Sequence, residues 1–382
     1  MIKLSHSAVQ RYVTCPREYF LHYIEKLRPT TLSSPLLFGN AIDKACEDYI
    51  LNRNLSRARE LFKRTWREQE HNDKVIDLQL CTEIDYLDSD ADPELLFQSD
   101  NELILKDTIF TNVSDLLKDL KSGRELSPED KQRLNYINWI SMYRKGRYLV
   151  ESFANWVDSN VEEVLSAQEQ IELEDGDGDQ VTGLADFVLK LLGHDKPIVI
   201  DLKTSGRYYD RNSVKDSDQL ALYLFYLRSK YEGMEKAGYF VLHKTIKKNR
   251  EKICSVCGYD GSGKNHKTCP NEIDGVRCNG AYNYRIFPEA STQYIVDEIQ
   301  EEKIEQVLDT FNTVKAQIVE GNFPKNETAC VRYNGKVTCP YKKYCESGCM
   351  DGLIDKKVLD KPNETKVQSI EQENDNGETV SK

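Results

Sequence analysis

Two charged residues follow a short apolar run in the stretch IVIDLKTSG, residues 198–206. Residues two apart in a β-strand point to the same face, so Asp201 and Lys203 should emerge together while Leu202 turns into the core. A second acid, Asp186, lies inside the preceding apolar segment GLADF, and the turn GHDKP would let the two strands pair. Asp186 is then expected to approach Asp201.

Two carboxylates that converge beside a lysine suit a hard divalent cation. Mg²⁺ and Mn²⁺ prefer oxygen ligands, polarise a phosphoryl oxygen and acidify an attacking water. The Leu202 main-chain carbonyl would be a further ligand, and Lys203 would orient the water or offset charge that develops at phosphorus. This chemistry fits phosphodiester hydrolysis. Taken alone, the Asp-x-Lys pattern also fits an ion pair at a surface edge.

The composition is that of a soluble globular protein. The chain has 382 residues, of which 39% are hydrophobic and 30% charged, enough for one domain with insertions or for two. No apolar run is long enough to span a bilayer, and the start of the sequence lacks the apolar stretch of a signal peptide, so we expect a cytoplasmic protein without membrane association. The net charge of -12 argues against a broad basic surface but leaves room for a local basic groove.

The pattern of apolar residues predicts an α/β fold in which helices flank an antiparallel meander of three strands. The predicted strands lie at 169–173, 184–192, 198–202 and 239–243, and at AYNYRIF after a cysteine-rich insertion. The predicted helices lie within 4–52, at 131–165 and 217–231, and across Ile295, Ile299, Val307, Phe311, Val314 and Ile318.

The predicted organisation has six segments. They are an N-terminal helical part (1–75), an acidic helical insertion (76–130), the α/β core (131–250), an inserted zinc ribbon (251–286), a C-terminal helix with a cysteine cluster (287–350) and a flexible tail (351–382). The tail is expected to be flexible because its polar and charged residues have almost nothing to bury.

Eight of the eleven cysteines fall in two groups in the last third of the chain. In a reducing compartment such cysteines are metal ligands or thiols more often than disulfides. The first group begins with CxxCG, a turn suited to a zinc knuckle, and consists of Cys254, Cys257, Cys269 and Cys278. We predict structural zinc here. His266 is an alternative ligand, and reduced loop cysteines are the alternative to a metal site. The ribbon would contact DNA or a partner protein.

These motifs together resemble the RecB-like exonucleases of the PD-(D/E)XK nuclease superfamily, which include the AddB nuclease domain and CRISPR-associated RecB-like enzymes. Five stretches carry the resemblance in order: LSHSAVQRYVTCPREYFLHY, FGNAIDKACEDYI, GLADFVL, IVIDLKTSG and QLALY. The resemblance implies a restriction-endonuclease-like core of helix, three-strand meander, helix and strand. It also implies a Mg²⁺- or Mn²⁺-dependent deoxyribonuclease, an exonuclease of recombination, repair or replication.

The resemblance implies roles for five residues of the core. Asp186 and Asp201 would bind the metal, and Lys203 would be the catalytic lysine. Gln219 and Tyr223, four apart on one face of a helix, would contact the active site or the DNA backbone. Without the other motifs, Gln219 would be interpreted as a polar residue at a helix N-terminus and Tyr223 as a core aromatic.

One position departs from the family pattern. Relatives usually have a metal-binding histidine in the segment FGNAID, where this chain has Asp43. Aspartate still binds Mg²⁺ or Mn²⁺ through oxygen, and Glu47, one turn later, is a second candidate ligand. A solvated helix carboxylate is the alternative for Asp43. The departure leaves open a catalytically weak or inactive DNA-binding or scaffold subunit that retains the fold.

The second cysteine group follows the core. The resemblance implies a [4Fe–4S] cluster held by Cys15, Cys330, Cys339 and Cys345. The eight residues between Cys330 and Cys339 depart from the usual C-x2-C spacing. The alternatives are buried thiols and a second zinc held by Cys330, Cys339, Cys345 and Cys349.

The expected partner is DNA with single- or double-stranded ends. No G-x4-GK[ST] phosphate loop accompanies the core, so a helicase would be a separate partner protein. A recombinase is the other candidate partner, by family association. A sequence-specific endonuclease on the same fold is a third functional hypothesis.

Overall fold

The computed structural model describes residues 2–30, 34–70, 115–116, 118–119, 122, 124–174, 180–262, 264–332 and 337–359. Most of the predicted acidic insertion and most of the predicted tail lie outside these residues. The chain divides into two compact units, one of residues 1–3 and 32–309 and the other of residues 4–31 and 310–382. Within the described ranges, no helix has the length and apolar character needed to cross a membrane.

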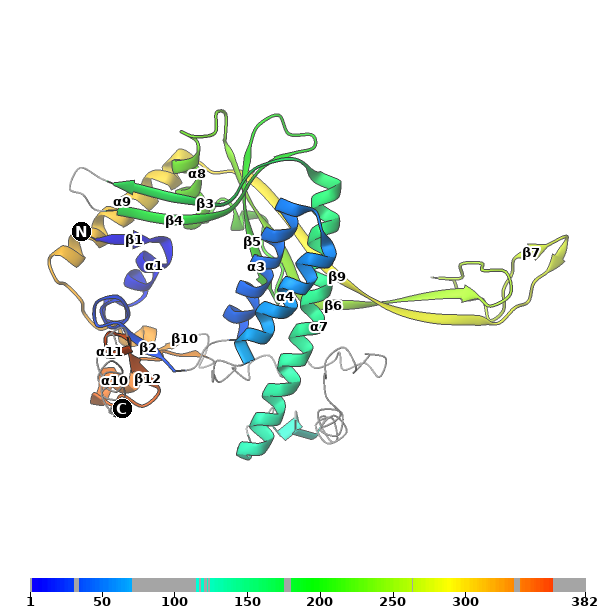
Figure 1. Ribbon diagram of the computed structural model, residues 1–382, viewed down its shortest axis with the longest axis horizontal. Helices are drawn as coiled ribbons and strands as arrows, with labels where there is room; N and C mark the ends of the chain where they lie inside the picture. Colours follow the sequence, from blue (N-terminus) through cyan, green and yellow to red (C-terminus); the bar gives the residue numbers. More distant parts are fainter. Residues whose placement is uncertain are drawn as a thin grey trace, which may run out of the picture. The chain divides into compact units, whose positions relative to one another are not determined.

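A mixed β-sheet lies at the centre of the first unit (Figure 1). β3 (Val161–Glu174) pairs antiparallel with β4 (Gln180–Leu191), and β4 pairs antiparallel with β5 (Ile198–Ser205). These strands form the meander that the sequence predicts. Phe187 lies opposite Ile200, so the next position along β4, that of Asp186, falls beside Asp201.

The sheet becomes parallel after β5. β5 pairs in parallel with β6 (Lys236–Cys254), and β6 pairs antiparallel with β9 (Tyr282–Glu298). Parallel neighbours need a crossover connection, and here it contains α8 (Asp218–Leu227). Ser217 precedes α8 and caps it, because its hydroxyl accepts a hydrogen bond from the Leu220 N–H.

Three helices pack on one another and on one face of this sheet (Figure 1). They are α3 (Ser34–Asn52), α4 (Leu55–Glu70) and α7 (Pro128–Asn160). Their buried side chains form a continuous core with alternate residues of β4, β5 and β6. The largest members of this core include Phe38, Phe62, Trp66, Phe153, Phe187 and Phe240.

Two predicted helix boundaries are wrong. The predicted helix at 131–165 ends at Asn160, because Val161 begins β3 and pairs with Leu191. The predicted C-terminal helix begins at Glu301 as α9 (Glu301–Val319), whereas Ile295 lies in β9 opposite Tyr239. In both segments the apolar spacing fits helix or strand, and pairing with a neighbouring strand decides between them.

β6 and β9 continue as a two-stranded arm beyond the other strands (Figure 1). The pairing with β5 ends at His243, and residues 246–254 then pair with β9 alone. At a strand rise of ~3.3 Å per residue, this arm is about 30 Å long. The cysteine-rich segment at its end contains a small hairpin of β7 (Glu272–Ile273) and β8 (Val276–Arg277).

The second unit combines segments from both ends of the chain. Its N-terminal part contains most of β1 (Lys3–Ser5), then α1 (His6–Thr14), α2 (Pro16–Tyr19), a π-helical turn η1 (Phe20–Ile24) and β2 (Leu27–Pro29). Its C-terminal part contains the end of α9, η5 (Glu327–Cys330), β10 (Val331–Arg332), β11 (Val337–Thr338), α10 (Lys342–Ser347), β12 (Leu353–Asp355) and α11 (Lys356–Leu359). β12 pairs with β2, and the Asn326 amide donates to the Thr14 carbonyl, so the two parts are hydrogen-bonded together.

Gly146 of α7 packs directly against the buried Phe62 ring, and a Cβ at position 146 would lie 1.9 Å from Phe62 Cζ. We predict that Gly146→Ala lowers the free energy of unfolding by about 2 kcal/mol or more, because the clash outweighs the better helix propensity of alanine. Urea denaturation measures this. The control is Gly39→Ala in α3, where the new Cβ would meet Thr204 Oγ1 at 3.7 Å. Equal unfolding midpoints for the two variants would contradict the packing.

Candidate active site

The end of β5 carries the predicted acid and lysine as an ion pair. Asp201 is only 2% exposed, and its Oδ2 lies 2.5 Å from Lys203 Nζ. Leu202 between them belongs to the core formed with α3, α4 and α7. Alternation along the strand therefore directs Asp201 and Lys203 to the opposite face, toward α8.

Asp186 is fixed beside this pair by main-chain and side-chain donors. Its Oδ2 accepts a hydrogen bond of 2.7 Å from the Leu202 N–H, and its Oδ1 accepts one of 3.4 Å from the Gln168 side chain. The sequence does not predict the role of Gln168. This residue has a φ of +54°, and a left-handed position for glutamine inside a strand has no sequence signal.

Gln219 and Tyr223 connect the lysine to the neighbouring strand. Lys203 Nζ donates to Gln219 Oε1 at 3.1 Å, and Gln219 Nε2 donates to the Tyr223 hydroxyl at 2.7 Å. The Tyr223 hydroxyl then donates to the Leu184 carbonyl on β4 at 2.6 Å. This chain of hydrogen bonds links α8 to both acid-bearing strands, so the two helix residues have fixed positions around Lys203.

Burial raises the pKa values of three carboxyl groups, and neighbouring carboxylates add to the shift in two of them. Burial raises the pKa of Asp186 well above its usual range, and the charges of Asp201 and Asp43 raise it further. Burial also raises the pKa of Asp201, although the Lys203 ammonium opposes the shift. On α3, burial raises the pKa of Asp43 to about 7, with Lys203 opposing and Asp201 reinforcing the shift. Asp43 thus belongs to the same electrostatic group. Glu47, half-buried, lies one turn further along α3.

Lys203 keeps its positive charge in this site. Burial disfavours the ammonium, but the Asp201 and Asp186 carboxylates outweigh burial and raise the Lys203 pKa above its usual value. Its Nζ also lies 5.9 Å from the centre of the Tyr239 ring, a residue of β6 opposite Asp201 that the sequence does not single out. The sequence predicts a strand at Tyr239, but only the pairing register of β5 with β6 places this residue beside Asp201.

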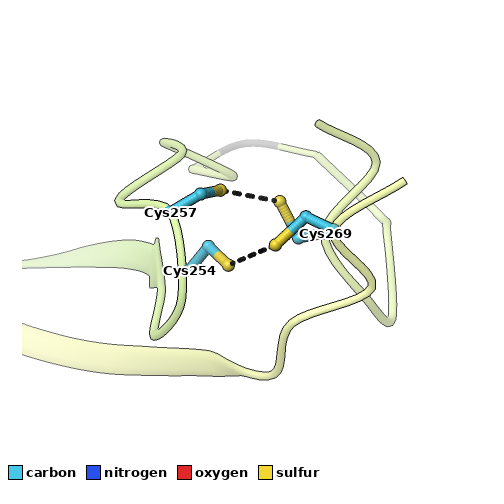
Figure 2. Close-up of side chains that lie close together, drawn as sticks. Cys254, Cys257 and Cys269 are labelled. Atoms are coloured by element: carbon cyan, nitrogen blue, oxygen red, sulfur yellow. Dashed lines mark hydrogen bonds between the residues drawn. The ribbon is translucent and has the colours of Figure 1, made fainter. Parts of the chain in front are cut away.

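The four ribbon cysteines gather at the end of the arm, and Figure 2 labels three of them, Cys254, Cys257 and Cys269. Their Sγ atoms all lie within 4.8 Å of one another, with 3.6 Å between Cys254 and Cys278 and 3.5 Å between Cys257 and Cys269. A tetrahedral site with Zn–S bonds of ~2.3 Å separates its sulfurs by about 3.8 Å. The group can therefore hold a metal ion. His266 is exposed and is not a member of it.

Two glycines allow the backbone to approach these sulfurs. Gly258 has a φ of +70°, and its N–H donates to the Cys254 carbonyl at 3.0 Å, which closes the CxxCG turn. A Cβ on Gly280 would lie 2.6 Å from Cys254 Sγ. Burial would raise the pKa of Cys257, but hydrogen bonds from the Tyr259 N–H and the Asn271 side chain outweigh it and lower this pKa to about 6.

The second cysteine group lies entirely in the second unit. The Cys339 N–H donates to the Cys330 carbonyl at 2.9 Å. Burial raises the pKa of Cys345. The charges of Arg17 and Lys325 oppose this shift, and those of Cys15 and Cys330 reinforce it. Among the described residues, only the ribbon cysteines form a group of three or more ligand side chains whose donor atoms all lie within 4.8 Å of one another. The second cysteine group does not meet this criterion. An iron–sulfur cluster or a second zinc in this unit therefore stays a prediction.

Comparison with protein families decides the class of this fold and site. The model of the PD-(D/E)XK nuclease superfamily matches residues 3–98 and 111–346, which include every core residue described above. The chain belongs to the PD-(D/E)XK nuclease superfamily. A comparison with curated proteins finds none that matches it. Membership implies a nuclease, and the mixed sheet flanked by helices is consistent with the fold of that superfamily.

The raised pKa of Asp43 predicts that stability falls as pH rises. An unfolded chain releases this proton near the ordinary pKa of 3.8, whereas the folded protein keeps it to about 7. Between these values the folded state binds more protons, so the free energy of unfolding decreases with pH. In metal-free buffer, wild type should lose about 2–3 kcal/mol more stability than Asp43→Asn between about pH 5 and about pH 8.

Denaturant titrations at both pH values measure the effect, with Glu47→Gln on the same helix as the control. Asp43→Asn and wild type losing equal stability would contradict a protonated Asp43 in the folded protein.

Proposed function

We propose that this chain is a Mg²⁺- or Mn²⁺-dependent DNA exonuclease of RecB-like type that acts in recombination, repair or replication. The observation that carries the proposal is the group formed by buried Asp201 with the partly exposed Asp186 and Lys203, extended by Gln219 and Tyr223. The order of the five motif stretches supports the RecB-like type. A separate recombinase or helicase is the proposed protein partner, by family association alone.

The donor set of the site suits a hard divalent cation. Asp186, Asp201 and Asp43 offer only oxygen atoms, and burial raises the pKa of each despite the nearby Lys203 ammonium. Asp186 and Asp201 would hold the ion, with Asp43, Glu47 and the Leu202 carbonyl as further ligands. Such an ion would polarise a phosphoryl oxygen and lower the pKa of an attacking water.

The protein's own residues would position the phosphate and stabilise its charge. Lys203 is protonated at neutral pH, so it would stabilise negative charge on the phosphoryl group rather than accept a proton. Gln219 holds Lys203 Nζ by its amide oxygen, and Tyr223 anchors Gln219 to the Leu184 carbonyl. The anchor keeps Lys203 in place on the strand next to Asp186.

The alternative is a catalytically weak or inactive DNA-binding or scaffold subunit. One observation favours it: Asp43 stands where relatives usually have histidine, and its pKa of about 7 keeps a fraction protonated at neutral pH without metal. A protonated carboxyl group is a poor metal ligand. The intact set of Asp186, Asp201, Lys203 and Gln219 favours the enzyme.

Degradation of labelled linear single- and double-stranded DNA with Mg²⁺ or Mn²⁺ tests the proposal. Asp201→Ala and Lys203→Ala should each lower the rate by about 10²- to 10³-fold or more, because each removes charge that the transition state requires. Asp195→Ala and Lys190→Ala make the same substitutions outside the site, at solvent-accessible side chains, and should keep wild-type rates. Wild type and site variants that behave alike on every substrate and metal would refute the nuclease proposal.

Closed circular DNA separates the two modes of cleavage in the same assay. An exonuclease needs an end, so circles should persist while linear DNA is degraded. Discrete fragments from circular DNA would instead support the sequence-specific endonuclease.

We also propose structural zinc at Cys254, Cys257, Cys269 and Cys278. An isolated two-stranded hairpin is marginally stable in water, so a metal at the end of the arm would hold its strands together. For the second unit we propose a [4Fe–4S] cluster at Cys15, Cys330, Cys339 and Cys345. The charge interaction of Cys345 with Cys15 and Cys330 supports it, since these thiols come from both ends of the chain.

Elemental analysis after anaerobic purification tests both metal proposals. Cys257→Ser should remove about one zinc per chain and keep the iron, because one thiolate of a closed four-thiolate site is lost. Cys345→Ser should remove the iron and the visible colour while the zinc stays. Ser255→Ala in the ribbon is the control and should keep both metals. Colourless protein with two zinc ions would contradict the cluster, and iron without zinc would contradict the ribbon site.

A further inference from the structure

Tyr208 is a large aromatic side chain that remains 62% exposed, five residues after Lys203. It lies in the connection between β5 and α8, with Arg207 before it and Arg211 shortly after it, both exposed. Single exposed apolar residues are common on protein surfaces, so exposure alone indicates nothing. The distinguishing property of Tyr208 is that its ring is held in one position.

Contacts with β6 and β9 fix this ring. The Tyr208 ring packs on His243 with centroids 3.9 Å apart, and its hydroxyl shares a hydrogen bond of 2.7 Å with Ser291 Oγ. The next residue is also fixed, because the Gln293 side chain bonds both the N–H and the carbonyl of Tyr209, each at 2.8 Å. One face of the Tyr208 ring is thus covered, and the side chain still presents most of its surface to solvent.

The strand register places this ring near the candidate active site. His243 lies opposite Ser205, and Val241 lies opposite Lys203. Paired residues of neighbouring strands point to the same face, so His243 shares the face of Asp201 and Lys203. Along the strand, His243 is one same-face step, about 7 Å, beyond the position of Lys203. An aromatic surface therefore lies one step from the residues proposed to act on a phosphodiester.

We propose that Tyr208 stacks on a base of single-stranded DNA next to the phosphodiester bond at the active site. Aromatic side chains bind unpaired bases without regard to sequence, because every base has a π face. Preorganisation by His243 and Ser291 lowers the entropy lost on binding. The flanking Arg207 and Arg211 carry the charge that a phosphate backbone requires. The inference rests on the proposed function, because it takes DNA as the substrate.

Binding measured without cleavage tests the inference. In an Asp201→Asn background, fluorescence anisotropy compares a labelled oligothymidylate with a strand of equal length that carries abasic sites. Tyr208→Ala should weaken binding of the oligothymidylate by about 5- to 150-fold and leave binding of the abasic strand unchanged. Tyr208→Phe keeps the ring and its contact with His243 but loses the bond to Ser291, so it should weaken binding much less than Tyr208→Ala does. Tyr148→Ala, at an exposed tyrosine of α7, is the matched control.

Each outcome separates the inference from the proposed function. Equal weakening on both strands, no weakening on either, or equal loss in Tyr208→Phe would overturn the stacking role. A wild-type protein that cleaves DNA while Tyr208→Ala binds normally refutes the inference and leaves the nuclease. A wild-type protein that cleaves nothing while Tyr208→Ala loses base-dependent binding refutes the nuclease and leaves the inference.

Discussion

Carboxylates removed from water lose their hydration and repel one another unless positive charge lies among them, and this cost is the main constraint on the centre of the first unit. Asp186 and Asp201 face each other on adjacent strands, and Asp43 reaches the same space from α3. The Lys203 ammonium offsets part of the repulsion, yet the pKa values of all three acids remain raised. In the absence of a cation, the charged forms of these carboxyl groups therefore lower the free energy of unfolding. The strands around them must be stable enough to hold an arrangement that is itself unfavourable.

The sheet supplies that stability through its topology. The antiparallel turn between β4 and β5 places Asp186 beside Asp201, and the Leu202 N–H binds the Asp186 carboxylate. The change to parallel pairing after β5 requires a crossover, and the helix in that crossover carries Gln219 and Tyr223 to the lysine. The segment that connects β5 to β6 thus also positions the side chains that hydrogen-bond to Lys203 and to one another.

Local patterns in the sequence are sufficient to predict the meander, the α8 helix and the four-cysteine group. Each depends on neighbouring residues: alternation in GLADF and IVIDLKTSG, a capping serine, and CxxCG. The misplaced helix ends at Leu165 and Ile295 arise where apolar spacing fits two structures and a distant strand selects one. Gln168 and Tyr239 could not be predicted, because their positions follow from strand register and from an unusual backbone angle.

The arm has a property that follows from its hydrogen bonding alone. Cys254 ends β6 directly opposite Tyr282 at the start of β9, so the chain enters and leaves the ribbon at adjacent points. A segment inserted there leaves the strand order of the sheet unchanged. At ~3.3 Å per residue it lies about 50 Å along β6 from Tyr239, the residue opposite Asp201. The length and sequence of the ribbon are thereby uncoupled from the geometry of the acids and the lysine. Evolution can exchange this module, and with it the surface that the arm presents, without rebuilding the site.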